Sequence, residues 1–379
     1  MAMDILISGG AGFIGSQLAL KLTALGHRVT VLDNLSPQVH GQQAALNSYL
    51  FGQVRDHVTF VAGDVTARGD WEQCLAGKDA VVHLAAETGT GQSMYQIARY
   101  TDVNVGGTAL LLDVLINTSN HSVKKVVLAS SRAVYGEGKY RGADGRVVYP
   151  PLRRKSELDR GNFDACMDGV PGPLTLEATD EDARLHPVSI YGLTKLQQEQ
   201  LLTMACNTID VAPVILRYQN VYGPGQSLLN PYTGILSIFS TLIRQGREIN
   251  IFEDGRESRD FVYIDDVVDA TILALTNPLA NGQVLNIGSG AATTVLEVAE
   301  TLMKHFAKTT PMRVSGSYRL GDIRHNVADI SRAATLGFLP KVTFDEGIRR
   351  FVEWVNGQRR VDNGFEQSLN EMAERGLFK

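Results

Sequence analysis

The chain has 379 residues, enough for a substantial core in one large domain or in two domains. Hydrophobic residues make up 44% of the chain and charged residues 20%, which is typical of a globular protein. The formal net charge of −5 gives no indication of a nucleic-acid-binding protein. It does not exclude an anionic small molecule, because local arginines can bind phosphate in an acidic protein.

The N-terminal sequence MAMDILISGG lacks a basic region followed by an apolar run and a cleavage site, so we expect no signal peptide. Apolar runs stay well short of the roughly 18 residues that a membrane-spanning helix needs. Cys74, Cys166 and Cys206 lie far apart, which indicates neither a disulfide framework nor a CxxC metal site. We therefore expect a cytoplasmic protein without a bound metal.

Short runs rich in Val, Ile and Leu recur along the first half of the chain. They predict strands at residues 4–8, 28–33, 58–64, 79–86, 124–130 and 212–218, with helices between them, for example at 14–26 and 107–119. Continuous apolar runs are typical of strands that are covered on both faces. The repeated order of strand and helix predicts an α/β protein with a doubly wound parallel sheet of the Rossmann type.

After Tyr218 helical patterns dominate, for example at 293–308 and 343–357. We interpret residues 1–219 as the nucleotide-binding Rossmann domain. Residues 220–379 are expected to form a smaller α/β domain that caps the carboxyl edge of the sheet and binds the substrate. Some segments are expected to cross between the two domains.

Three glycines, Gly9, Gly12 and Gly15, lie between the first predicted strand and the first predicted helix. In this context they predict a sharp turn whose backbone meets a pyrophosphate at the helix N-terminus. Asp33 ends the second strand 18 residues after Gly15, where its carboxylate can accept hydrogen bonds from the adenosine ribose and repel a 2′-phosphate. This favours NAD over NADP. Asp64 follows the third strand, where it either meets the adenine or simply forms a turn.

Tyr191 and Lys195 form a YxxxK pattern in the segment SIYGLTK, and residues four apart share one face of a helix. The alternative is a purely structural role, in which a buried aromatic residue lies beside a solvated lysine. An ammonium at Lys195 can favour the phenolate of Tyr191, whose ordinary pKa of about 10 makes it a poor base. Ser131 ends the fifth strand at the edge where ligands bind, and its hydroxyl can bond the same substrate oxygen. The combination favours proton-coupled hydride transfer at a carbinol.

The chain resembles the extended short-chain dehydrogenases/reductases of the nucleotide-sugar epimerase/dehydratase family. The matching segments run in order through almost the whole chain: GGAGFIG, HLAA, NVGGT, SSRAVYG, YGLTK, RYQNVYGPG, RESRDFVYIDDV, NIGSG and GDIRH. The resemblance implies that Ser131, Tyr191 and Lys195 are catalytic. The residues that it implies near NAD are Gly9, Gly12, Phe13, Ile14, Gly15, Asp33, Asn34, Asp64, Val65, Leu84, Ala85, Ala86, Asn104, Tyr191 and Lys195.

The resemblance also implies a nucleoside-diphosphate sugar as substrate, with Ser131 at the sugar. Asn220 would bond a diphosphate oxygen or a sugar hydroxyl. Arg259 and Arg324 would clamp the diphosphate with their forked donors. For any single arginine, the alternative is a solvated ion pair on the surface.

The segment after Ser131 indicates the type of reaction. Dehydratases of this family carry an Asp-Glu pair there and decarboxylating relatives a glutamate, because elimination needs a further acid/base pair. This chain has Arg132 and Ala133 instead. We therefore expect oxidation and reduction at C4 through a transient 4-keto sugar, which inverts C4 without net consumption of NAD. A reductase that uses NADPH is disfavoured by Asp33.

About fifty residues, 137–186, separate VYG from PVSIYGLTK, where UDP-galactose 4-epimerases have a much shorter connection. This insertion resembles that of bacterial dTDP-L-rhamnose 4-epimerases, several of which carry a CxxC pair. Only Cys166 remains here, so we expect no zinc. The expected substrate is dTDP-L-rhamnose or a related 6-deoxysugar.

Several alternatives stay open. They are a UDP-glucose or UDP-N-acetylglucosamine 4-epimerase, a reductase of nucleotide 4-keto-6-deoxysugars, and an NAD-responsive binding protein without catalysis. The resemblance further implies a homodimer through helices near residues 95–118 and 190–207. The apolar character of these helices would also fit the core of a monomer.

Overall fold

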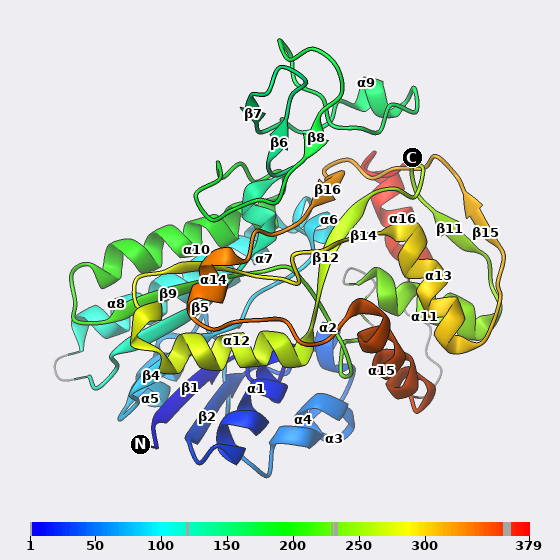
Figure 1. Cartoon of the computed structure of the whole chain (residues 1–379). Coiled ribbons are helices and arrows are strands. Elements are labelled where there is room, and N and C mark those ends of the chain that lie inside the picture. The colour runs from blue at the N-terminus through cyan, green and yellow to red at the C-terminus, as the bar shows by residue number, and fades with distance from the viewer. Residues whose placement is uncertain (1, 119–120, 229, 231–233, 359–364) are drawn as a thin grey trace.

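The structure is a computed structural model that describes residues 2–118, 121–228, 230, 234–358 and 365–379. At its centre is a seven-stranded parallel sheet (Figure 1). In spatial order its strands are β13 (Val284–Ile287), β9 (Ala212–Tyr218), β5 (Lys125–Ser131), β4 (Ala80–His83), β1 (Asp4–Ser8), β2 (Arg28–Asp33) and β3 (Thr59–Ala62). The predicted fold class is confirmed.

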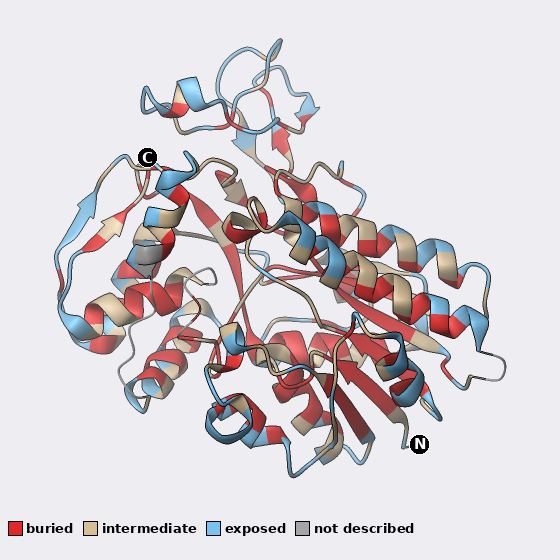
Figure 2. Ribbon diagram, turned by 180° about the vertical axis from the view of Figure 1, so that it is seen from behind, coloured by how far each residue is buried: buried red, intermediate tan, exposed pale blue. Residues whose placement is uncertain are grey.

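Helices cover both faces of this sheet, and its strands are mostly buried, apart from the edge strand β3 (Figure 2). The alternation of side chains along β1 shows the two layers. Ile5 and Ile7 belong to the core cluster that includes side chains of α1 (Phe13–Ala24) and α12 (Ile264–Thr276). Leu6 belongs to the opposite cluster. That cluster is formed with side chains of α5 (Arg68–Leu75), α8 (Gly107–Asn117) and α10 (Ile190–Cys206).

Short helices occupy many of the connections. They are α2 (Pro37–His40), α3 (Ala44–Asn47), α4 (Tyr49–Val54), α6 (Thr90–Ser93), α7 (Ile97–Tyr100), the π-helix η1 (Thr101–Gly106), the 3₁₀ helices η2 (Arg132–Tyr135) and η3 (Pro278–Ala280), and α14 (Ser331–Thr335). Within the described ranges, no helix combines the length and the apolar character that crossing a membrane requires.

The remaining elements form the smaller part of the molecule, on the right of Figure 1. Its strands are β10 (Asn220–Tyr222), β12 (Ser258–Tyr263), β14 (Ala292–Thr294) and β16 (His325–Asn326), together with the pair β11 (Ile249–Ile251) and β15 (Met312–Val314). Its helices are α11 (Ile235–Gln245), α13 (Val295–Phe306), α15 (Phe344–Asn356) and α16 (Phe365–Glu374). Because β13 and α12 belong to the large sheet and its covering layer, these layers take elements from both sides of residue 219.

The insertion at residues 137–186 folds into a small unit of its own at the top of Figure 1. It consists of an antiparallel sheet with the order β7 (Val147–Val148), β6 (Tyr140–Arg141) and β8 (Thr175–Leu176), and of α9 (Lys155–Leu158). Tyr140, Val148 and Ala165 form its small buried cluster.

Candidate active site

The turn between β1 and α1 is built from backbone in close contact. Gly9 has a φ of +71°, and a Cβ at this position would lie 2.7 Å from the backbone nitrogen of Ala85. A Cβ on Gly15 would lie 2.3 Å from the carbonyl oxygen of Gly9. Gly12 is the N-cap of α1 and provides no side-chain cap, so the amides of Phe13 and Ile14 begin the helix without one. This open helix N-terminus fits the pyrophosphate of a dinucleotide.

Asp33 lies beside this turn at the end of β2. Its Oδ2 atom accepts a hydrogen bond from the Ala11 amide at 3.0 Å, and its Oδ1 atom accepts one from the Leu35 amide at 2.8 Å. Burial raises the pKa of the Asp33 carboxyl, and these amides act in the opposite direction. A carboxylate that accepts two bonds has further acceptor capacity, which suits ribose hydroxyls.

Asp64 has its carboxylate engaged in local structure. It accepts hydrogen bonds from the Asn34 side chain at 2.8 Å and from the Thr66 amide at 2.9 Å. Asp64 therefore forms the turn that was considered for it, and its contact with adenine stays a prediction. Val65, the next residue, would contact a Cβ placed on Gly107, so it packs against the start of α8.

Asn104 connects the segment after β4 to the helix that carries Tyr191. The segment starts with Leu84, whose amide bonds Ser8, and continues through Ala85 and Ala86. Asn104 is fully buried in the π-helix. Its amide nitrogen donates to the Glu87 carbonyl at 3.1 Å and to the Thr194 hydroxyl at 3.0 Å, while its oxygen accepts from the Glu87 amide at 2.8 Å. Asn104 therefore links the segment after β4 to α10.

Ser131 and Tyr191 come together at the carboxyl end of the sheet. Ser131 ends β5, and its side chain is close enough to the Tyr191 hydroxyl to lower the pKa of that phenol. Tyr191 lies in the first turn of α10, where Ser189 caps the helix by accepting from the Gly192 amide at 3.1 Å. The predicted serine and tyrosine are thus adjacent in space.

Lys195 lies on the same face of α10, 5.9 Å from the centre of the Tyr191 ring. Its ammonium donates to the Ala129 carbonyl at 2.9 Å rather than to the tyrosine hydroxyl. Burial lowers the pKa of Lys195 to about 7, and the nearby Glu199 carboxylate opposes this shift. Lys195 is therefore beside Tyr191, with its ammonium bound to the main chain of β5.

The protein groups around Tyr191 act on its pKa in opposite directions. Burial raises the pKa of Tyr191, whereas the Ser131 hydrogen bond and the charge of Arg132 lower it. Burial has the larger effect because a phenolate loses more hydration than these two groups replace. The protein groups alone keep the phenol protonated at neutral pH.

Glu199 and Arg217 form a buried ion pair close to the catalytic residues. Arg217 on β9 donates to both carboxylate oxygens of Glu199 on α10, at 3.0 and 2.8 Å. Glu199 also accepts from the hydroxyl of Ser130, the neighbour of Ser131 on β5. Arg217 further donates to the Tyr135 hydroxyl at 2.8 Å. This network joins β5, β9, α10 and η2, and sequence reasoning missed it.

Two of the residues expected to bind the diphosphate lie beside this centre. Asn220 begins β10, and its Oδ1 atom accepts from Arg132 Nε at 2.7 Å. Arg259 on β12 is held by three carbonyl groups, those of Ser258 and Ile323 at 2.8 Å and that of Arg324 at 3.1 Å. Within the described ranges, no carboxylate pairs with Arg259.

Arg324 has a different environment from the one that the sequence suggested. Its guanidinium is buried and donates to both oxygens of Asp254 at 2.7 Å, to Glu253 at 3.1 Å and to Asp164 of the insertion at 3.0 Å. Its expected contact with the diphosphate stays a prediction. In this structure Arg324 joins the insertion to the smaller part of the molecule.

The insertion is anchored by a second buried arginine. Arg153 donates to both carboxylate oxygens of Glu253 at 2.8 Å and to the Asp322 carbonyl at 2.9 Å. Its Nε atom lies 3.3 Å from Glu137, whose pKa is raised to about 7 by burial. The insertion therefore contacts the segment 249–254 at Glu253.

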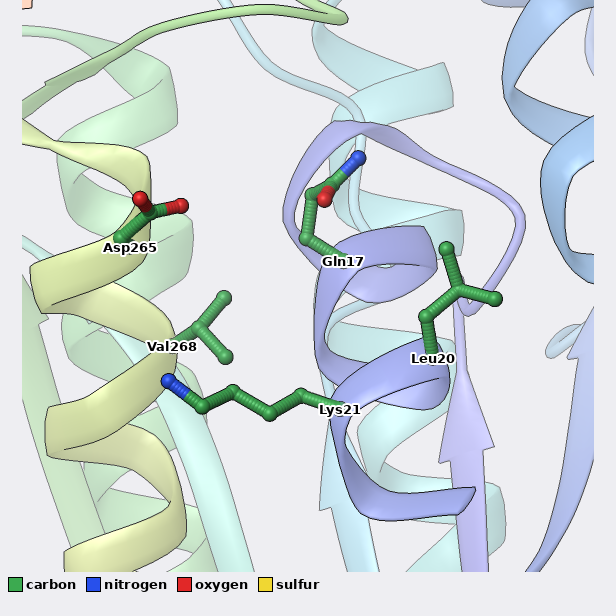
Figure 3. Close-up of a pocket in the computed structure, with 5 residues that line it drawn as sticks. All are labelled: Gln17, Leu20, Lys21, Asp265 and Val268. Atoms are coloured by element: carbon green, nitrogen blue, oxygen red, sulfur yellow. The ribbon is translucent and has the colours of Figure 1, made fainter. Parts of the chain in front are cut away.

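A surface pocket lies away from these residues, between α1 and α12 (Figure 3). It is lined by Gln17, Leu20, Lys21, Asp265 and Val268. It shares no residue with the predicted site. In the described part of the chain, no cluster of His, Cys, Asp or Glu has the makeup of a metal site.

Comparison with known proteins identifies the family. The sequence model of the NAD dependent epimerase/dehydratase family matches residues 5–157 and 165–288. The chain belongs to this family. A dTDP-L-rhamnose 4-epimerase of Burkholderia thailandensis is 40% identical over 354 residues, which cover 93% of this chain and 94% of that protein.

Solved structures of the family have the same fold. The UDP-glucose 4-epimerase of Thermotoga maritima with UDP-glucose has a TM-score of 0.75 at 30% identity, covering 94% of this chain and 99% of the other. The UDP-glucose 4-epimerase of Thermus thermophilus with NAD has a TM-score of 0.74 at 27% identity, covering 94% and 100%. The predicted family membership, enzyme class and NAD dependence are confirmed.

We predict that Glu199→Gln strongly destabilises the protein, because it leaves the charge of Arg217 buried without its partner. The expected loss in the free energy of unfolding is about 3–5 kcal/mol, measured by chemical denaturation. Glu177→Gln, which breaks the exposed pair with Arg141, is the matched control, with an expected loss of about 0–1 kcal/mol. Equal losses in the two variants would contradict the importance of the buried pair.

Proposed function

We propose that this member of the nucleotide-sugar 4-epimerase family inverts C4 of dTDP-L-rhamnose or of a related 6-deoxysugar. The observation that carries the proposal is the placement of Ser131 beside the Tyr191 hydroxyl, with Arg132 where an eliminating enzyme needs carboxylates. The choice of sugar is supported by the 40% identity with the Burkholderia protein over nearly the full length of both chains.

In the proposed mechanism Tyr191 takes the proton of the C4 hydroxyl, and the Ser131 hydroxyl bonds the same oxygen. The glycine turn would hold NAD, which would supply the hydride acceptor and donor for C4 and a pyridinium charge that favours the phenolate. The 4-keto sugar rotates about its diphosphate linkage, so that C4 is reduced on its other face. Tyr191 then returns the proton to the C4 oxygen.

The supporting residues have separate roles in this proposal. Gly9, Gly12 and Gly15 leave room for the pyrophosphate of NAD, and Asp33 binds the ribose. Lys195 adds positive charge close to Tyr191. The smaller part of the molecule, residues 220–263 and 288–379, binds the nucleotide sugar through Asn220 and Arg259.

A UDP-glucose 4-epimerase is the second candidate, because the Thermotoga structure has this fold with UDP-glucose bound. To separate the candidates, purified protein is incubated with dTDP-L-rhamnose or UDP-glucose without added reductant, and inversion at C4 is followed by NMR. We expect inversion of dTDP-L-rhamnose. Turnover only with NADPH would instead indicate a reductase, and binding without any turnover would indicate a binding protein.

Removal of the Tyr191 hydroxyl tests the assigned base. Tyr191→Phe is expected to reduce kcat by about 10²–10⁴-fold, the usual contribution of a general acid/base group, while the NAD content stays unchanged. Tyr140→Phe is the control, because Tyr140 is also buried and its hydroxyl has no partner among the described residues. Undiminished turnover in Tyr191→Phe would rule out this tyrosine as the base.

We further propose that the protein is a homodimer. Large hydrophobic side chains are exposed on α7, α8 and α10, namely Ile97, Ile116, Leu193 and Met204. Exposed apolar groups gathered on neighbouring helices are typical of an interface. A second copy of the chain would cover them.

Charges placed on these helices test the dimer. The double variant Leu193→Glu/Met204→Glu is expected to elute as a monomer in size-exclusion chromatography with light scattering. Dimer formation would bury the two new carboxylates of each chain in the interface, which is unfavourable. Leu339→Glu is the control, since Leu339 is 65% exposed, like Met204 at 69%, but lies outside these helices. A wild-type monomer, or a double variant that stays dimeric, would contradict the proposal.

A further inference from the structure

Arg132 joins the catalytic centre to the part of the molecule that binds the substrate. It directly follows Ser131 and begins the 3₁₀ helix η2. Its Nε atom donates to Asn220 Oδ1 at 2.7 Å, across 88 residues of sequence. The guanidinium is therefore placed between the end of β5 and the start of β10.

The hydrogen bond to Arg132 determines what Asn220 offers to a ligand. A guanidinium has only donors, so the carbonyl oxygen of the Asn220 amide must face it. The Nδ2 group of Asn220 is then left as a donor for another molecule. Arg132 and Asn220 together present donors and no acceptor.

The other donors of Arg132 have no partner among the described residues. Within the described ranges, neither of its Nη groups has a hydrogen-bond partner, and no carboxylate forms an ion pair with it. Arg259 is close enough for the two charges to repel each other, and it too lacks a carboxylate partner in the described chain. The carboxylates of Asp322 and Glu137 act on Arg132 only from beyond ion-pair distance. Two neighbouring cations without a paired carboxylate favour an anionic ligand.

We propose that Arg132 is a substrate-binding residue whose Nη groups bind the β-phosphate of the nucleotide sugar, next to its link to the sugar. The forked donors of an arginine match two oxygens of one phosphate. Asn220 Nδ2 is the second donor to this group, held in place by Arg132 Nε. The inference rests on the proposed function and adds a phosphate contact from the Rossmann side of the site.

Arg132 also acts on the catalytic tyrosine through its charge. Burial lowers the pKa of Arg132 to about 9, so the side chain is positive at neutral pH. This charge lowers the pKa of Tyr191, together with the Ser131 hydrogen bond. The other groups that face Tyr191 are Lys195 on α10 and the ring of Tyr100, 6.5 Å away between centroids. Binding and proton transfer are thereby linked in one residue.

Nucleotide binding to the NAD-containing protein tests the phosphate contact. Calorimetric titrations compare the binding of dTDP with that of dTMP, and the binding of UDP with that of UMP. The proteins titrated are wild type, Arg132→Met and Arg132→Lys. The control is Arg141→Met, in which an arginine of the insertion is removed. We expect Arg132→Met to weaken diphosphate binding about 10–100-fold, as for a lost charge-assisted contact. Monophosphate binding should change less than twofold, and Arg132→Lys should be intermediate.

The pH profile provides a readout that a structural role would not move. Without the charge of Arg132 the pKa of Tyr191 rises, so the acidic limb of kcat should shift to higher pH in Arg132→Met and partly return in Arg132→Lys. Unchanged diphosphate affinity, an equal loss for mono- and diphosphates, or an unshifted limb overturns the proposal.

The same data separate this inference from the proposed function. If the wild type turns over no sugar but Arg132→Met selectively loses diphosphate affinity, the epimerase assignment fails and the phosphate contact stands. If the wild type inverts C4 while Arg132→Met binds dTDP and UDP normally, the epimerase assignment stands and the phosphate contact fails.

Discussion

The ion pair between Glu199 and Arg217 is the interaction on which the catalytic centre depends. Both side chains are buried, and buried charges of this kind are stable only with well-placed partners. Because Glu199 lies one turn after Lys195 on α10, and also bonds Ser130 on β5, its position fixes the helix against the strand. Ser131 and Tyr191 are then brought together by the surrounding backbone rather than by their own contact alone.

Much of this arrangement was predictable from local sequence. The strand at 4–8 and the end of the second strand at Asp33 agree with the structure, because continuous apolar runs and glycine punctuation are strong signals. The carboxyl ends of parallel strands meet at one edge, which is why Ser131 and the glycine turn could be placed in one site. Helix ends were less certain: the helix expected at 293–308 runs from Val295 to Phe306.

The partners of individual charges could not be predicted in this way. Arg324 matched a family motif, yet its carboxylate partners include Asp164, which lies 160 residues earlier in a segment without that motif. The protonation of Tyr191 depends on how much water its surroundings exclude, and no spacing of residues contains that quantity. The contact of Arg132 with Asn220 likewise appears only when two distant segments are folded together, although the arginine beside Ser131 was visible as a departure from the family pattern.

The contacts that attach the insertion restrict which segments can be exchanged between related enzymes. Glu253 adopts a left-handed backbone conformation with a φ of +49°, and its carboxylate is shared between Arg153 of the insertion and Arg324. A chimera that replaced residues 137–186 with the short connection of other relatives would leave this strained, buried acid with half of its partners. The length of the loop at residues 137–186 is therefore coupled to the acidic residue at position 253. Recombination between long-loop and short-loop enzymes is expected to succeed only when the loop and this acidic residue are exchanged together.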